Sequence, residues 1–181
     1  MSPRVDDRPR PGRVLLTEDE LRARVTALGR TIARDYATVN PIVVGVLQGA
    51  VLFMADLIRA IPIDLATDFI ALSSYGAGTT ASGAVRLVSD LSTPIDGRDV
   101  LIVEDIVDTG HTLAYLMRTL EARRPKSLKV CVLLDKVERR ETVVDLDYLG
   151  FTIPNVYVVG YGFDYGGLYR NLPYVAELAM P

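Results

Sequence analysis

The sequence predicts an α/β fold with a central, mostly parallel sheet that is flanked by helices. Largely apolar runs at 42–47, 99–103 and 127–134 are typical of strands that are covered on both faces. Segments with helical periodicity lie between these runs, and strands that alternate with helices favour a parallel sheet. The length of 181 residues suits one compact domain with a substantial core.

Local signals define the individual elements. Thr17 and Glu20 form a capping box, which predicts that a helix begins there. An apolar stripe at three- and four-residue steps continues this helix through Leu21, Val25, Leu28, Ile32 and Tyr36. Further helices are expected at about 50–60 and 111–123. Further strands are expected at 63–74, 84–89 and 156–159, and the charged stretch 136–147 is expected to be irregular.

Two segments carry no regular pattern. Residues 1–13 are polar and rich in Arg and Pro, so we expect a disordered tail there and one domain over 14–181. Residues 75–83 are small, polar and rich in glycine. A plain hairpin connection would explain them, but the loop is longer than most hairpins need, and such loops often serve as lids.

Composition excludes several classes of function. The net charge of -3 argues against a protein that mainly coats nucleic acid. One Cys, Cys131 in an apolar run, and one His leave no basis for a zinc site with soft ligands, whereas magnesium on oxygen ligands stays open. No apolar stretch approaches the roughly 20 residues of a membrane span. The first 13 residues lack a secretory signal, so a cytoplasmic protein is expected.

The most informative stretch runs from the buried strand at 99–103 into the next helix. Glu104 and Asp105 stand where this strand is expected to leave the core, and ligands of parallel sheets bind at that end. Adjacent carboxylates repel each other and lose hydration, so a sugar diol or a magnesium ion would stabilise them.

A second feature follows a few residues later. Asp108, Thr109, Gly110, His111 and Thr112 lead into the helix, whose first N–H groups can bind a phosphate. An ordinary N-cap by Asp108 or Thr109 is the alternative explanation. Paired carboxylates followed by a phosphate site describe a pocket for ribose 5-phosphate.

This segment resembles the phosphoribosyl pyrophosphate motif of the type I phosphoribosyltransferases. Other stretches, in the same order along the chain, resemble the hypoxanthine-guanine branch of that family: 68–70, 73–76, 90–92, 134–136, 157–165 and 169–173. The resemblance implies the family fold, with a small hood built from the chain ends. It also implies magnesium-dependent transfer of ribose 5-phosphate from phosphoribosyl pyrophosphate to N9 of a 6-oxopurine.

The resemblance also implies a role for each matching residue. Asp108 matches the proton-transferring carboxylate, and Glu104 and Asp105 match the pair that binds ribose and magnesium, with Asp164 as a further metal ligand. The 5-phosphate loop corresponds to Thr109, Gly110, His111 and Thr112. Pyrophosphate binding corresponds to Gln48, Gly49 and Arg170, the lid to Ser74 and Tyr75, and purine binding to Lys136, Tyr157 and Val158.

One departure and three alternatives accompany this interpretation. Gln48 stands where the family usually has Lys. Because this loop acts largely through main-chain N–H groups, we expect pyrophosphate binding to be retained, with a lower affinity for lack of the cation. A xanthine- or guanine-preferring transferase uses the same residues. A nucleotide-sensing RNA-binding regulator would need a basic face, and a receiver domain would need a phosphoacceptor Asp and a later Lys that this chain does not combine. We expect a homodimer or homotetramer and no nucleic-acid or membrane partner.

Overall fold

A computed structural model describes residues 8–74 and 85–179, which form two sheets of unequal size. The larger sheet has the strand order β4-β3-β2-β5-β6-β7, and only β4 runs antiparallel to its neighbour. The bounds of its strands are β2 Ile42–Leu47, β3 Ala66–Ser74, β4 Val85–Ser89, β5 Asp99–Val107, β6 Ser127–Asp135 and β7 Tyr148–Thr152. The expected central, mostly parallel sheet is therefore confirmed.

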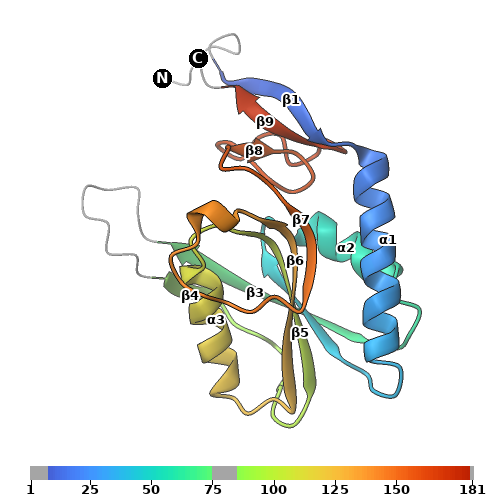
Figure 1. The fold of residues 1–181 in the computed structure, drawn as a ribbon. Helices are drawn as coiled ribbons and strands as arrows, with labels where there is room; N and C mark the ends of the chain where they lie inside the picture. The colour runs from blue at the N-terminus through green and yellow to red at the C-terminus, as the bar shows by residue number, and fades with distance from the viewer. Residues whose placement is uncertain (1–7, 75–84, 180–181) are drawn as a thin grey trace.

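Helices cover both faces of this sheet (Figure 1). Helices α1 (Glu18–Asp35) and α2 (Val51–Arg59) lie on one face, and α3 (His111–Glu121) lies on the other. The capping box of Thr17 and Glu20 starts α1, and its predicted apolar stripe is buried. Each face has its own apolar cluster, and Cys131 is fully buried in the first, where burial raises the pKa of its thiol. No helix of the described segments is long and apolar enough to cross a membrane.

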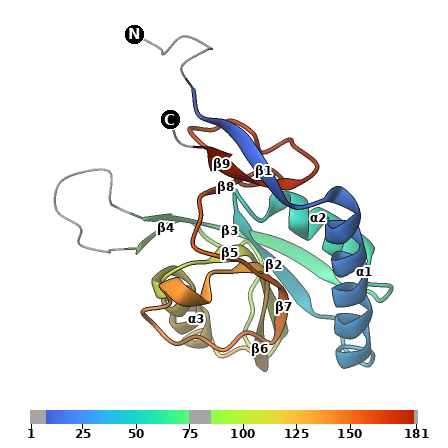
Figure 2. The same cartoon turned by 45° about the horizontal axis from the view of Figure 1, so that its top comes forward.

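A smaller sheet forms a hood above the carboxyl ends of the large one (Figures 1 and 2). Its strand order is β1-β9-β8, with all pairs antiparallel, and its strands are β1 Arg10–Leu16, β8 Val158–Val159 and β9 Val175–Ala179. The two ends of the chain thus pair with each other. The expected tail is wrong for residues 10–13, because pairing with β9 orders a segment whose own composition does not predict a strand.

Two further boundaries differ from expectation. Strand β5 continues to Val107, so Glu104 and Asp105 belong to the strand itself, because pairing with β6 continues as far as Asp135. The irregular stretch after β6 contains the short 3-10 helix η2, Val137–Arg139, and is followed by β7. Apart from these, the predicted helices and strands end within a few residues of those found.

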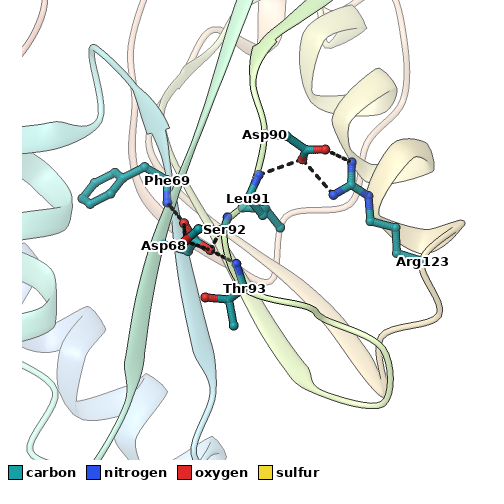
Figure 3. A network of polar contacts seen from close by, with 7 residues as sticks. All are labelled: Asp68, Phe69, Asp90, Leu91, Ser92, Thr93 and Arg123. Carbon is teal, nitrogen blue, oxygen red and sulfur yellow. Dashed lines mark hydrogen bonds and ion pairs between the residues drawn. The ribbon is translucent and has the colours of Figure 1, made fainter.

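A buried carboxylate ties the end of β4 to β3. Asp68 is 7% exposed, and it accepts hydrogen bonds from the backbone N–H groups of Phe69, Ser92 and Thr93 and from the Ser92 hydroxyl (Figure 3). Burial raises the pKa of Asp68, but the hydrogen bonds from Phe69, Thr93 and Ser92 together bring it below its usual value. The motifs at 68–70 and 90–92 therefore meet in one network.

Candidate functional site

Side chains from both sheets converge on a cavity of about 290 Å³ where the hood meets β5 and β6. It is lined by Gly49, Asp105, Ile106, Asp108, Lys136, Tyr157, Val158, Phe163, Asp164 and Arg170. A larger cavity of about 860 Å³ lies between α1, α2 and residues 171–173. We assign the site to the smaller cavity because a carboxylate with a shifted pKa, a buried Lys and an Arg meet there, whereas the larger cavity does not combine them.

The two carboxylates of β5 sit in an unfavourable environment. Glu104 is 9% exposed, and its Oε2 atom is buried without a hydrogen-bond partner among the described residues. Burial and then the charge of Asp105 raise the pKa of Glu104 well above its usual value. Burial likewise raises the pKa of Asp105 to about 6, although the N–H of Ile106 donates to it at 2.7 Å. A donor or a cation would stabilise both groups.

Close backbone packing surrounds Asp105. A Cβ at Gly49 would lie 1.6 Å from Asp105 Oδ2, so any other residue there would displace this carboxylate. A Cβ at Gly162 would lie 2.2 Å from the carbonyl oxygen of Gly49, which brings the hood against the same loop. The peptide bond between Leu47 and Gln48 is cis, and the Gln48 side chain is exposed. Because Gly49 lines the cavity and has no side chain, this loop presents its main chain to the site.

Asp108 lies between two cations. Lys136 is only 8% exposed, and its Nζ lies 3.8 Å from Asp108 Oδ2. Nε of Arg139 lies 2.7 Å from Asp108 Oδ1. The N–H of Lys136 donates to the carbonyl oxygen of Val107, which fixes this Lys at the end of β6 beside the end of β5. A buried Lys needs such a neighbouring carboxylate, because an isolated buried ammonium is costly.

The start of α3 has no side-chain cap. Gly110 is the N-cap residue with φ +90°, and no side chain accepts a capping hydrogen bond from the helix. The N–H of His111 makes only a long contact of 3.5 Å to Thr109 Oγ1. The alternative explanation, an ordinary N-cap by Asp108 or Thr109, is therefore not found at the described start of this helix. Free N–H groups at a helix N-terminus favour an anion.

The hood supplies an aromatic ring and a charged pair. Tyr157 is 50% exposed, although the neighbouring Val158 and Val159 are buried in β8. Its hydroxyl donates to the carbonyl oxygen of Asp164 at 3.0 Å. Nη2 of Arg170 lies 2.6 Å from Asp164 Oδ1. The ring of Tyr157 is therefore held at the cavity wall and stays half exposed.

Comparisons with known proteins match this arrangement. The family model described as phosphoribosyl transferase domain matches residues 15–166. The hypoxanthine-guanine phosphoribosyltransferase of Bacillus subtilis is 46% identical over 166 residues, which cover 92% of each chain. The bifunctional protein TilS/HprT of Listeria innocua is 49% identical over 166 residues, or 92% of this chain and 26% of that protein. The chain thus spans about a quarter of the bifunctional relative.

A solved structure agrees with the sequence relatives. The hypoxanthine phosphoribosyltransferase of Staphylococcus aureus has a TM-score of 0.89 at 42% identity, and the match covers 96% of this chain and 93% of that one. This chain belongs to the phosphoribosyl transferase family. The resemblance noted from the acidic motif is confirmed, and so is the family fold with its hood.

The structure brings half of the predicted phosphoribosyl transferase site residues into the lining of one cavity. Eight of them line it: Gly49, Asp105, Asp108, Lys136, Tyr157, Val158, Asp164 and Arg170. Glu104 and Gln48 are their direct chain neighbours but are not in the lining, and Thr109–Thr112 follow Asp108 into α3. Ser74 ends β3, whereas Tyr75 and the rest of the expected lid lie outside the described residues. The individual roles stay predictions.

The side chains of the site offer oxygen ligands that suit magnesium, but they do not complete its coordination. The available donors are carboxylate oxygens, which suit this ion, and the unpartnered Oε2 of Glu104 is one of them. Within 8–74 and 85–179, no three His, Cys, Asp or Glu side chains are grouped as a metal site. Asp105 and Asp164 line the same cavity. A magnesium ion here would need further oxygens from water or substrate phosphates.

Four residues near the site were not predicted. Arg139 contacts Asp108, Arg140 pairs with the buried Asp135, and Glu141 and Thr142 contact the start of α3. The sequence does show two adjacent Arg residues after Lys136. Their partners could not be read from it, because η2 turns the chain back toward α3 within a few residues.

Proposed function

We propose that this phosphoribosyl transferase transfers ribose 5-phosphate from phosphoribosyl pyrophosphate to N9 of hypoxanthine or guanine, giving IMP or GMP and pyrophosphate, in purine salvage. The observation that carries the proposal is the meeting of Asp105, Asp108, Lys136 and Arg170 around one cavity, beside an exposed Tyr157 ring. The names of the Bacillus subtilis and Staphylococcus aureus relatives support the choice of base.

The purine would occupy the hood side of the cavity. The Tyr157 ring stacks on the base, which contributes on the order of 1 kcal/mol or more. Lys136 donates to the exocyclic O6, which adenine lacks, so this contact selects 6-oxopurines. The main chain of Val158 contacts the purine edge. Lys136, Tyr157 and Val158 all line the same cavity, which supports this arrangement.

The sugar donor would bind across the ends of the strands. Glu104 and Asp105 accept hydrogen bonds from the ribose hydroxyls, which offsets their burial. The N–H groups of Thr109–Thr112 bind the 5-phosphate at the uncapped start of α3. Arg170 and the Gln48-Gly49 main chain bind pyrophosphate, since a guanidinium forms paired hydrogen bonds with phosphate oxygens.

The reaction exchanges one bond at the anomeric carbon for another. The bond from that carbon to the pyrophosphate oxygen breaks, and a bond to purine N9 forms. The proton that the purine loses moves to Asp108, and Lys136 and Arg139 lie beside this carboxylate. The closed contact between hood and Gly49 loop helps to exclude water from the reacting atoms.

Magnesium would bind on the carboxylate side of the cavity. Glu104, Asp105 and Asp164 would hold it, directly or through water. When bound, the ion neutralises charge on the departing pyrophosphate. The raised pKa of Asp105 and the unpartnered oxygen of Glu104 support a cation there.

An assay of nucleotide formation tests the proposal. Purified protein is supplied with phosphoribosyl pyrophosphate and with hypoxanthine, guanine, xanthine or adenine, with magnesium or with EDTA. We expect IMP and GMP to form only with magnesium, and little AMP. Preferential use of xanthine would instead assign the alternative specificity, and no product with any base would refute the proposal.

We also propose that the protein acts in the cytoplasm as a homodimer or homotetramer. Exposed apolar side chains on α2 and β3 support self-association.

A further inference from the structure

Residues 140–142 pack directly against the start of α3. The N–H groups of Glu141 and Thr142 both donate to the carbonyl oxygen of Thr109, at 2.9 and 3.0 Å. A Cβ at Gly110 would lie 2.5 Å from the carbonyl oxygen of Thr142 and 3.2 Å from Cδ of Arg140. Backbone therefore meets backbone here, and the position of Thr109 and Gly110 depends on the 140–142 segment.

The side chain of His111 reinforces this contact. Its Nε2 lies 2.8 Å from Glu141 Oε2, and its Nδ1 lies 2.8 Å from Thr142 Oγ1. A carboxylate only accepts hydrogen bonds, so Nε2 donates to Glu141. Both ring nitrogens are thus used within the protein. The imidazole is directed to the 140–142 segment and has no nitrogen left for a phosphate.

These contacts do little for overall stability but much for local geometry. His111 and Glu141 side chains are 49% and 63% exposed, and exposed pairs contribute little to folding. The start of α3, however, has a glycine N-cap at φ +90° and no side-chain cap. Its N–H groups bind an anion well only if their directions are fixed in advance. Residues 140–142 contact Thr109 and Gly110 and so help to fix these directions.

The same segment links the two halves of the site. It follows Lys136 and Arg139, which contact Asp108 on the purine side. Six residues after Lys136, Thr142 contacts the phosphate side through His111. The short segment 136–142 therefore contacts residues on both the purine side and the phosphate side of the site.

We propose that Glu141 and Thr142 are positioning residues, which act through His111 to hold the N–H groups of Thr109–Thr112 ready for the 5-phosphate. This inference rests on the proposed function, because it assigns the phosphate of phosphoribosyl pyrophosphate and of the product nucleotide to that loop. Neither residue touches the substrate. Their effect is on affinity for phosphate-bearing ligands.

Paired variants separate the side-chain contacts from the fold. Thr142→Val and Glu141→Ala remove a contact to His111, whereas Thr142→Ser and Glu141→Gln keep one. Each is compared by KM for phosphoribosyl pyrophosphate, by kcat, and by calorimetric Kd for GMP and for guanosine, which lacks the phosphate. Arg22→Gln on α1, which removes two exposed ion pairs at residues distant in the sequence from 140–142, is the matched control.

We expect Thr142→Val and Glu141→Ala to raise KM for phosphoribosyl pyrophosphate and Kd for GMP by about threefold to tenfold, the effect of one lost hydrogen bond. We expect kcat, KM for hypoxanthine and Kd for guanosine to stay within about twofold. Thr142→Ser, Glu141→Gln and Arg22→Gln should resemble the wild type.

Two results would overturn the inference while leaving the proposed function intact: an active wild type with unchanged GMP affinity in both truncating variants, or an equal loss for GMP and guanosine. A wild-type protein that forms no nucleotide and binds no GMP would overturn the proposed function, and the inference with it.

Discussion

Asp108 is the side chain on which the proposed chemistry depends most. Asp108→Asn keeps the size of the side chain but removes the proton acceptor. We expect kcat to fall about a hundredfold or more, since general acid–base groups contribute on the order of 10² to 10⁴. KM values should change by less than about threefold, because the binding groups remain. Steady-state kinetics measures both, with the exposed Asp96→Asn as control. Unchanged turnover would remove the proton-transfer role.

Lys136 offers a test of base selection. It is buried beside Asp108, so Lys136→Met, which keeps the apolar stem, is the variant of choice, and Lys136→Ala is its companion. We expect kcat/KM for hypoxanthine to fall about tenfold to a hundredfold, as for a lost charged hydrogen bond. The low rate with adenine should change far less. Equal losses for the two bases would argue against contact with O6.

The buried Glu104 lowers the stability of the folded protein at neutral and higher pH. Because its pKa is raised by burial and then by Asp105, the folded protein binds a proton that the unfolded chain releases in the same pH range. Stability therefore falls as pH rises above the usual Glu range, about 4.3, toward the raised value. Glu104→Gln lacks this loss. Thermal unfolding should show the variant about 2 to 4 °C more stable at pH 8 and equal to wild type at pH 4.

At the scale of elements, Asp68 connects β3 to the segment after β4 (Figure 3). Asp68→Asn places an amide against N–H donors, which leaves some of them unpaired and should cost about 2 kcal/mol at pH 7. The lowered pKa of Asp68 means that its contribution is present above the usual Asp range and is lost as pH falls through the lowered value. Denaturant unfolding should therefore show the largest difference at neutral pH.

Asp90 provides the matched control for that experiment. It pairs with Arg123 at 2.8 Å, but the two side chains are 48% and 32% exposed. Such a pair is worth about 1 kcal/mol or less, so Asp90→Asn should have a much smaller effect. Equal effects of the two substitutions would contradict the role assigned to Asp68.

Most elements could be predicted from the sequence, and the exceptions have physical reasons. Helix α1 carries a capping box and a full apolar stripe, and β2 is apolar throughout, so local signals suffice. Strands β1 and β9 exist because they pair with each other across the whole length of the chain, which no local pattern reports. Strand β7 is five residues long and follows a charged stretch. Tertiary pairing decides such short segments.

Some residues of the candidate site could likewise be predicted from the sequence, and others could not. Asp105 lies near the end of β5, and Asp108 and Lys136 directly follow β5 and β6, so both their place and their chemistry were accessible from the sequence. The contacts of His111 with Glu141 and Thr142 span about 30 residues and pass through an irregular turn. Side-chain pairing of this kind depends on the folded backbone, and the sequence predicted no role for these two partners.

At the scale of the molecule, the proposed self-association can be tested at exposed apolar side chains of α2 and β3. Val51 and Leu52 of α2 and Phe69 of β3 are 39%, 36% and 39% exposed, and Phe69 and Met54 of α2 both pack at Gly45. We expect light scattering to give a multiple of 19.8 kDa. Leu52→Glu should shift the mass toward the monomer, since a charge disfavours burial there. The same substitution at Val143, which is exposed elsewhere, is the control.

The pairing of Arg10 with Ala179 places the first and last described strands edge to edge. A short linker could therefore join the two ends, and new ends could be opened in the exposed turn between α3 and β6 without breaking any strand pair. For the same reason a fused domain at either end would sit beside the hood. Circular permutation and domain fusion are thus compatible with this architecture.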